Sequence, residues 1–548
     1  MGERGYSACA SRTANLEYGS LMKLSTSRPQ TNGHDADSLQ FVQLWFLVNM
    51  NISSYETGSA LLAVGMTWWQ AIIVILVGDF IASCFAVLNS YSGAQSHVGY
   101  PIVSRSVWGM WGAYFPILTR ILPSIVWYGV QAVIGGKMVY VCIRAIWPSV
   151  ENIHNTFAAD AGITTAQFMG YVIFNFFCCI LIWFPPNKLR HYFHVGSVLV
   201  FIANLALLGW ALGQRGPDGF GPVFASRTDL KGSALAWNML NGIMSVIGSI
   251  ASGILNQNDF TRFAKRTNQV TWTQFLSFNF TSAFIHIAGV LVTASTQIKY
   301  GKGTPLWDVS DLFVAMQDQL GSKGRAATFF LAAAFIISQC SINVPGNVLA
   351  AGLDIASILP RYVNLRRGAY IIAALSVAPV PWKQLASGSV FLSVLSAYAV
   401  FLGPMVGLLC VHYYLIQKRV FHIPDLYEGS SKSAYWYTYG FNWRTFIAWV
   451  CAVVPSMPGF VHSIHGAGNI EEGATHIFNL TFILGFFLAA FFAYMLHWIF
   501  PVEYPPENCS QMELAMEGIE GVAESNGSES EMGEKNVSLF RAKEALAA

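Results

Sequence analysis

The feature that most constrains this chain is a series of apolar stretches, each about as long as one membrane crossing. A membrane-spanning helix needs roughly 20 mainly apolar residues. We identify twelve such stretches, of which the ninth is the shortest, at 40–65, 68–89, 111–146, 167–185, 192–213, 234–256, 272–297, 326–358, 367–381, 388–416, 444–465 and 475–500. Only 11% of the 548 residues are charged, against about a quarter in a soluble domain. The sequence therefore predicts an all-α integral membrane protein with twelve transmembrane helices.

The apolar stretches divide the chain into a membrane domain and two polar tails. Residues 1–39 lack the apolar core of a signal peptide, and we predict a disordered cytosolic tail. Residues 40–500 form the twelve-helix domain, and residues 501–548 form an acidic cytosolic tail. Lys and Arg concentrate in the loops that become cytosolic when the N-terminus is placed inside, and an even number of spans then places both termini there. Lys535 and Lys543 in the second tail are candidate sites for ubiquitination or endocytic machinery.

The third stretch contains an aromatic and an amide residue one helical turn apart. Trp127 and Gln131 are four residues apart, which places them on one face of a helix. An amide in the hydrocarbon region is costly unless it has a partner. An indole covers the face of a flat ring while an amide binds its polar edge. The pair therefore predicts a site for a flat, polar, uncharged ring.

Two stretches that lie five apart in the series look interrupted. Polar residues crowd the middle of the first: Asn49, Asn51, Ser53, Ser54 and Glu56. Glycines and serines loosen the sixth: Gly242, Ser245, Gly248, Ser249, Ser252 and Gly253. Broken helices in corresponding positions of two halves indicate an inverted repeat with the binding site at the breaks. The alternative for the glycines of the sixth stretch is close packing between helices.

The eighth stretch adds two asparagines on one helix face. Asn343 and Asn347 are four apart, and Pro345 between them removes a backbone donor and kinks the helix. We expect these amides to face the site, and the alternative is hydrogen bonding between helices. Before this stretch, apolar residues at helical spacing in 307–319 predict an amphipathic helix on the outer surface.

Several ordered motifs resemble those of one transporter family. They are Trp127–Gln131, Asn256–Lys265, Asp354–Gly368, Pro185–His191, Ser396–Pro404 and Tyr439–Arg444. Together they make the chain similar to the nucleobase–cation symporter 1 family, and within it to the fungal Fur-type uracil/allantoin branch. The resemblance spans nearly all of residues 40–500.

The resemblance implies a LeuT-like fold, in which two inverted repeats of five helices are followed by two further helices. It implies uptake by alternating access at the plasma membrane. It also implies that Trp127 stacks on the substrate, that Gln131 hydrogen-bonds it and that Asn347 supplies a second amide. Ser249, after Gly248, falls at a position of variable specificity that is often aromatic or Lys in the family. Two aromatic residues in the tenth stretch are candidates for an outer gate: Phe391 and Tyr398.

The coupling ion is predicted from the eighth stretch. Sodium-coupled members use hydroxyl groups there, and this chain has Ser338 and Ser341 but Ile342 where a threonine would complete the site. Isoleucine offers no oxygen to a hard cation. We therefore expect protons as the coupling ion, no bound metal and no cofactor. The candidates for proton coupling are the intramembrane carboxylates: Glu56, Asp79 and Asp354.

A cytosolic gate is also predicted from charge. Asp354 is expected to pair with Lys188 or Arg190 in an ion pair that opens and closes with transport. The alternative is a fixed salt bridge.

The sequence favours proton-coupled uptake of a small flat nucleobase-type substrate, such as uracil, allantoin or a related catabolite. Within the family, the alternative is transport of thiamine or nicotinamide riboside, whose carriers lack the Trp-x-x-x-Gln pair. The alternative of another class is a sensor that does not transport. The sequence shows no nucleophile–base pair, phosphate loop or metal cluster, so we do not expect an enzyme. His194 and His286 are interpreted as packed or hydrogen-bonded histidines.

Overall fold

The computed structural model describes residues 38–158, 161–214, 230–359, 361–465, 471–502 and 504, and the regular elements within these ranges are helices. The tails predicted at 1–39 and 501–548, including Lys535 and Lys543, lie almost entirely outside the described residues. Each of the twelve apolar stretches corresponds to one helix or to consecutive helices. The helices that form them are α2 (Ser38–Asn49) with α3 (Ile52–Ala63), α4 (Trp68–Ser96), α6 (Tyr114–Ile146), α7 (Thr165–Trp183), α8 (Pro186–Leu212), α10 (Gly232–Ser249) with α11 (Ala251–Leu255), α13 (Thr267–Thr296), α14 (Val309–Asn343) with α15 (Ala350–Ile358), α16 (Leu365–Leu375), α17 (Gly388–Val411), α19 (Trp443–Val453) with α20 (Met457–His465), and α22 (Thr481–Ile499).

Nine helices in the described part of the chain are long and apolar enough to cross a membrane. The three remaining predicted stretches are those that are interrupted or short: α2–α3, α10–α11 and α16. Shorter helices connect the spans: α5 (Tyr100–Trp108), α12 (Gln257–Thr261), α18 (Ile423–Tyr427) and α21 (Glu472–Phe478).

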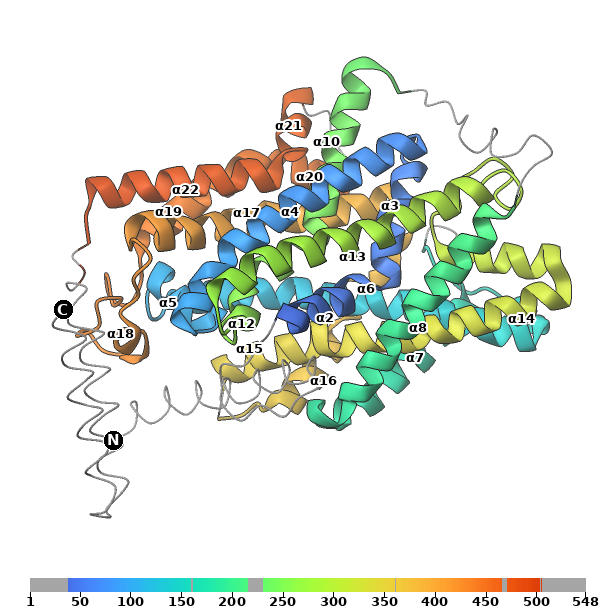
Figure 1. Cartoon of the computed structure of the whole chain (residues 1–548), viewed down its shortest axis with the longest axis horizontal. Coiled ribbons are helices and arrows are strands. Elements are labelled where there is room, and N and C mark those ends of the chain that lie inside the picture. Colours follow the sequence, from blue (N-terminus) through green and yellow to red (C-terminus); the bar gives the residue numbers. More distant parts are fainter. Residues whose placement is uncertain are drawn as a thin grey trace, which may run out of the picture.

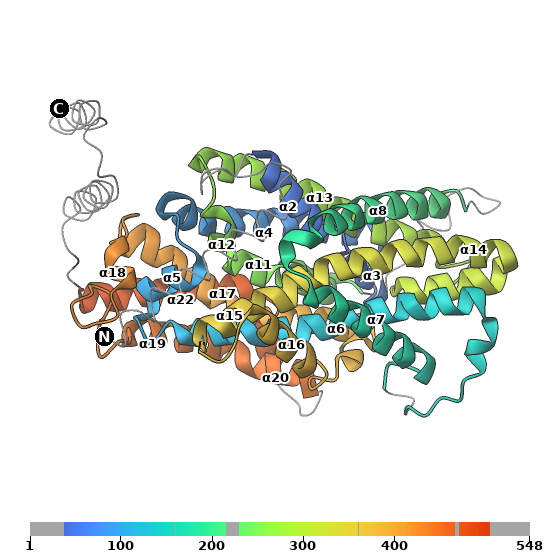
Figure 2. The same ribbon diagram turned by 90° about the horizontal axis from the view of Figure 1, so that it is seen from below.

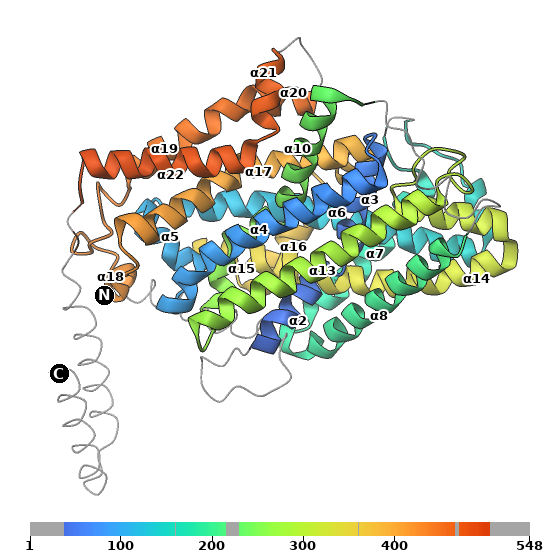
Figure 3. The same ribbon diagram turned by 45° about the horizontal axis from the view of Figure 1, so that its top comes forward.

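The long helices run roughly along one axis of the molecule (Figure 1). At one end lie α5, α12 and α18, which we call the α18 end, and at the other lies the bend of α14, which we call the α14-bend end. Helix α13 packs against α2, α3 and α4, and it lies beside α4 in the turned views (Figures 2 and 3). Helices α19 and α22 pack together at the side of the bundle, and α22 also packs against α17.

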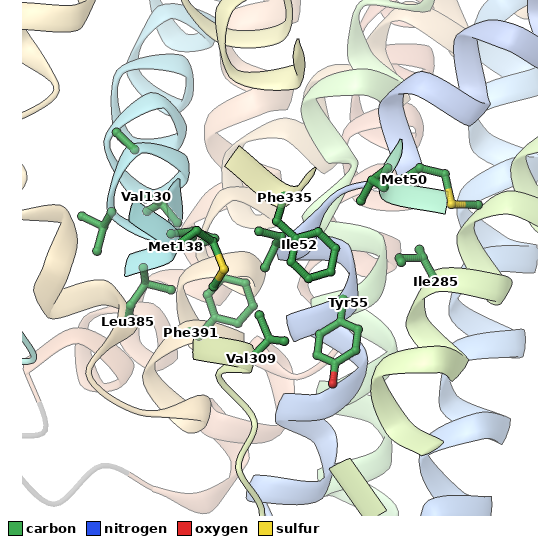
Figure 4. Packing of buried hydrophobic residues seen from close by; sticks show 14 of the residues in the cluster. Met50, Ile52, Tyr55, Val130, Met138, Ile285, Val309, Phe335, Leu385 and Phe391 are labelled. Atoms are coloured by element: carbon green, nitrogen blue, oxygen red, sulfur yellow. The ribbon is translucent and has the colours of Figure 1, made fainter. Parts of the chain in front are cut away.

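Helix α14 contains both the amphipathic segment predicted at 307–319 and the span predicted from residue 326, separated by a kink. It runs from Val309 through the amphipathic segment and turns back at Gly321, whose φ of 58° suits a residue without Cβ. The apolar face predicted there is confirmed, and Val309 and Phe313 are fully buried. This face packs on the protein core instead of on the membrane surface. Figure 4 shows Val309 close to Tyr55 of α3 and Phe391 of α17.

Candidate functional site

The first span is broken as predicted. Helix α2 ends at Asn49 and α3 begins at Ile52, with Asn51 in extended conformation as the N-cap of α3. The Asn51 carboxamide oxygen accepts hydrogen bonds from the Ser53 hydroxyl at 2.6 Å and from the Ser54 backbone N–H at 2.9 Å. The polar residues crowding this stretch thus satisfy backbone groups that the break leaves without helical partners.

The sixth span is broken at two points, Ile250 and Asn256, which separate α10, α11 and α12. Gly248 packs so tightly against α17 that a Cβ would overlap the Leu395 carbonyl group. Gly248 is therefore explained by helix packing, whereas Ser249, one residue later, lines a cavity. The Ser249 hydroxyl donates to the Val246 carbonyl of its own helix at 2.7 Å.

A cavity of about 170 Å³ lies at the two breaks. Drug-sized ligands occupy pockets of about 300–1,000 Å³, so this cavity suits a smaller molecule. It is lined by Leu44, Trp45, Val48, Asn49, Asn51, Ser53, Ser54, Thr57, Ser124, Trp127, Gln131, Ser249, Ile250, Ser252, Gly253, Asn256, Gln257, Phe260, Ser282, His286, Ile342, Gly346 and Asn347. Four of the predicted binding residues are among them: Trp127, Gln131, Ser249 and Asn347.

Trp127 and Gln131 reach the cavity together from α6. The Gln131 amide nitrogen donates to the Ser53 hydroxyl at 2.8 Å, and its carbonyl oxygen accepts a short hydrogen bond from the Gln339 amide. The amide is therefore held in a fixed orientation by α3 and α14. Ser53 and Gln339 therefore support the amide, a role that the sequence pattern did not assign to them.

The two asparagines of the eighth span have different surroundings. A π-helical turn, Val344–Leu349, follows Asn343 at the predicted kink and contains Pro345. Asn347 lines the cavity and donates to the Asn343 carboxamide oxygen at 2.8 Å. Asn343 is fully buried and donates to the Tyr128 carbonyl at 3.2 Å. Asn343 thus lies behind the cavity wall and orients Asn347.

Two aromatic residues of α17 pack on other aromatic rings, and neither is among the residues that line the cavity. The Tyr398 ring is 6.2 Å from the Trp127 ring, centroid to centroid. Toward the α14-bend end, Phe391 stacks on Trp307, with centroids 5.7 Å apart and planes at 24°. These are the two residues predicted as a gate.

Asp354 does not pair as predicted. Its carboxylate accepts two hydrogen bonds from Arg120, one from Nε at 2.8 Å and one from Nη2. Arg120 also donates to Asp259 at 2.9 Å. The Lys188 side chain is exposed, and that of Arg190 lies outside the described residues. The sequence signal for Arg120 was available, because an arginine inside an apolar stretch requires buried carboxylates.

A second buried charge cluster lies toward the α14-bend end. The Lys137 ammonium contacts the Asp308 carboxylate at 2.6 Å, and both side chains are buried. Burial alone would raise the pKa of Asp308, but Lys137 and hydrogen bonds from Ser310 outweigh it and hold that pKa below its ordinary value. Glu56 is also buried in this region, and its Oε2 has no hydrogen-bond partner among the described residues.

Asp79 of α4 is paired with α13. Its Oδ1 accepts a hydrogen bond from the Ser282 hydroxyl at 2.8 Å, and its Oδ2 is 3.3 Å from the His286 Nδ1. Ser282 and His286 both line the cavity. His286 is therefore part of an acid–imidazole pair at the cavity wall.

The predicted degenerate sodium site has the following geometry. The Ser338 hydroxyl donates to the Met50 carbonyl at the break of the first span, at 3.4 Å, and the Ser341 hydroxyl donates to Ile337 at 2.8 Å. Ile342 lines the cavity with its hydrocarbon side chain. Within the described residues, no group of three or more His, Cys, Asp or Glu is arranged to hold a metal ion.

Comparison with known proteins gives a consistent family. Residues 29–485 match the family described as permeases for cytosine/purines, uracil, thiamine and allantoin. An uncharacterized permease of Schizosaccharomyces pombe is 32% identical and covers 88% of this chain and 82% of its own length. The uridine permease and the allantoin permease of Saccharomyces cerevisiae are each 31% identical over 85% of this chain, and the alignments cover 73% and 74% of those proteins.

Solved structures show the same fold. The nucleobase-cation-symport-1 transporter Mhp1, closed with bromovinylhydantoin bound, superposes with a TM-score of 0.65 at 17% identity and covers 88% of this chain and 97% of its own. Its inward-facing form gives a TM-score of 0.68 at 16% identity, covering 89% and 98%. The LeuT-like arrangement, with broken first and sixth helices, is confirmed.

Proposed function

The chain belongs to the family of permeases for cytosine/purines, uracil, thiamine and allantoin, and we propose that it imports a small planar nucleobase-type compound, uracil or allantoin, together with protons. The α18 end faces the cytosol in this proposal, both termini lie on that side, and the membrane is the plasma membrane. The protein works as a transporter and not as an enzyme.

The observation that carries the proposal is the composition of one small cavity. Trp127 offers a flat apolar surface, and the amides of Gln131 and Asn347 offer both donors and acceptors. A planar ring with alternating carbonyl and N–H groups matches this combination, since stacking covers its face and amides pair with its edge. Ser249 leaves the opposite wall small, and the cavity volume of about 170 Å³ favours a free base over a nucleoside or thiamine.

Proton coupling is supported by the side chains at the break of the first span. Ile342 supplies no ligand for sodium, and the Met50 carbonyl oxygen accepts a hydrogen bond from the Ser338 hydroxyl. Carboxylates are buried among the spans, and intramembrane carboxylates are common proton carriers.

Uptake by a cell lacking its own nucleobase carriers tests the function. We expect concentrative uptake of labelled uracil or allantoin that unlabelled substrate abolishes and excess thiamine does not. Competition by thiamine or nicotinamide riboside alone would show that the alternative substrate class is correct. Absence of concentrative uptake, with the protein at the cell surface, would favour a sensor.

The coupling ion is tested in the same cells. A protonophore should collapse accumulation, and replacement of sodium by choline should leave it unchanged. A strict sodium requirement would contradict the interpretation that Ile342 leaves the sodium site incomplete.

A further inference from the structure

We propose that the imidazole of His286, fixed by Asp79, takes up the coupling proton and presents it to the substrate in the cavity. The inference rests on the proposed function, because it assigns the proton of that import to one atom, His286 Nε2. Asp79 acts as a positioning residue that fixes the ring and balances its charge.

The hydrogen bonds around Asp79 fix the tautomer of the histidine. The Ser282 hydroxyl donates its proton to Asp79 Oδ1 at 2.8 Å. His286 Nδ1 lies 3.3 Å from Asp79 Oδ2 and 3.3 Å from the Ser282 oxygen. A lone pair on Nδ1 would face a carboxylate, so Nδ1 carries the hydrogen. In the neutral ring, Nε2 is then an acceptor without hydrogen.

This acceptor is left without a partner beside the cavity. His286 is only 2% exposed, and its Nε2 has no hydrogen-bond partner among the residues that the structure describes. The residue lines the cavity together with Thr57 and Ser282. A buried polar atom without a partner is unfavourable, and a polar group of a substrate in the cavity would supply the missing partner.

Protonation changes what Nε2 can bind. The imidazolium donates from Nε2, so it binds a carbonyl or a deprotonated ring nitrogen of the substrate, whereas the neutral ring binds an N–H. Substrate with a carbonyl toward His286 therefore binds better when the proton is present, and the proton binds better when substrate is present. This reciprocal effect is the coupling that a symporter requires.

The charges around the pair favour this role. From α4, the group that faces His286 is Asp79, which stabilises the imidazolium. From α3, Thr57 lines the same cavity and Gly58 packs on the His286 backbone, whereas the ionisable Glu56 interacts with Asp308 and Lys137. Helices α2 and α10 carry no ionisable side chain. Helix α8 contacts α13 through the ring of Phe201, which packs on Phe284.

The other two carboxylate candidates are placed less well for direct coupling. Asp354 is held by two hydrogen bonds from Arg120, and Glu56 lies in the cluster with Lys137 and Asp308. Neither lines the cavity, whereas the Asp79–His286 pair adjoins it.

The transport cycle conserves protons. With the cavity open to the outside, one proton from external water binds Nε2 and gives an imidazolium paired with the Asp79 carboxylate. Substrate accepts the hydrogen bond, and the cavity then opens to the cytosol. Substrate leaves, Nε2 releases the proton to cytosolic water, and the neutral ring returns with Nδ1–H still on Asp79.

The test uses the full-length protein in proteoliposomes with labelled uracil and allantoin as probes. For symport of one proton per substrate, each unit of pH gradient supports about a tenfold accumulation. We expect His286→Gln to retain exchange of internal for external substrate but to lose accumulation driven by the gradient. Substrate-induced proton entry, measured with an internal pH dye, should disappear, and the KM should no longer depend on external pH.

A second variant and a control make the outcome decisive. Asp79→Asn should shift the pH dependence of KM while keeping exchange. The control is His412→Gln, because His412 is also fully buried, has an unpartnered Nδ1 and bonds Thr445 at 3.2 Å, but lies outside the cavity. It should behave as the wild type.

The inference is overturned if His286→Gln still accumulates substrate to the wild-type ratio with normal proton entry. If His286→Gln does not fold, unchanged pH dependence in Asp79→Asn overturns it instead. The proposed function fails on a separate result, namely that the wild type transports neither uracil nor allantoin, or that its transport requires sodium.

Discussion

Truncating Gln131 to alanine should weaken substrate binding by more than any loss of folded protein accounts for. In the structure, the Gln131 amide donates to Ser53 at 2.8 Å and accepts from Gln339. The variant removes the amide from the cavity and leaves those two groups without their partner. Two lost hydrogen bonds to the substrate, at about 0.5–1.5 kcal/mol each, give about 1–3 kcal/mol. The substrate KM should therefore rise by roughly 5- to 150-fold.

The assay is uracil and allantoin exchange in proteoliposomes, with the amount of folded protein measured by size-exclusion chromatography. The matched control is Gln317→Ala. Gln317 is also a buried glutamine, which donates to Thr328 at 2.9 Å and accepts from Arg144 at 2.9 Å, but it does not line the cavity. The control measures the general cost of truncating a buried amide in this fold.

The reasoning is refuted if Gln131→Ala and Gln317→Ala have the same KM. It is also refuted if Gln131→Ala loses binding only in proportion to loss of folded protein. In either case Gln131 would be a structural bridge between α3 and α14 and would have to be removed from the site.

Three further variants test other parts of the structure. Arg120→Met leaves two buried carboxylates without their partner and should lower the free energy of unfolding by about 3–5 kcal/mol, seen as a lower melting temperature of the purified protein. Lys188→Met at the surface should leave the melting temperature unchanged, and equal melting temperatures for the two variants would argue against a buried triad. Ser249→Phe should fill the cavity and abolish uracil uptake at normal surface expression. Ser249→Ala should retain uptake, because the Ser249 hydroxyl bonds a carbonyl of its own helix. Uptake by the phenylalanine variant would place the substrate elsewhere. Ile342→Thr restores a hydroxyl beside the broken first span and should introduce stabilisation by sodium in a thermal-shift assay, with Ile337→Thr as control; no difference between the two would contradict the interpretation of the sodium site.

The spans and their breaks could be predicted from the sequence because both follow from local physics. Apolar length sets a membrane crossing, and polar residues crowded into a span mark backbone that must be satisfied without a helix. Asn49 and Asn51 made the first break visible, and the structure ends α2 and starts α3 at these residues. The same local argument placed Trp127 and Gln131 on one face of α6.

Pairings between distant segments could not be predicted. Arg120 is 139 residues from Asp259 and 234 from Asp354, and nothing local to Asp354 distinguishes this partner from nearby lysines and arginines. The sequence predicts that His286 is packed or hydrogen-bonded but does not identify its partner, since Asp79 is 207 residues away. Periodicity likewise identified the apolar face that begins at Val309 but not whether lipid or protein covers it.

Two buried charge clusters connect the helices at opposite ends of the bundle. Arg120 joins α6 to α12 and α15 at one end, and Lys137 joins α6 to the start of α14 near the other. Separating a buried ion pair is costly only while the charges remain without water. When a helix movement admits water, solvation replaces the lost partner and most of that cost disappears. Each cluster is therefore costly to separate while its surroundings stay dry, and much less costly to separate once water reaches its charges.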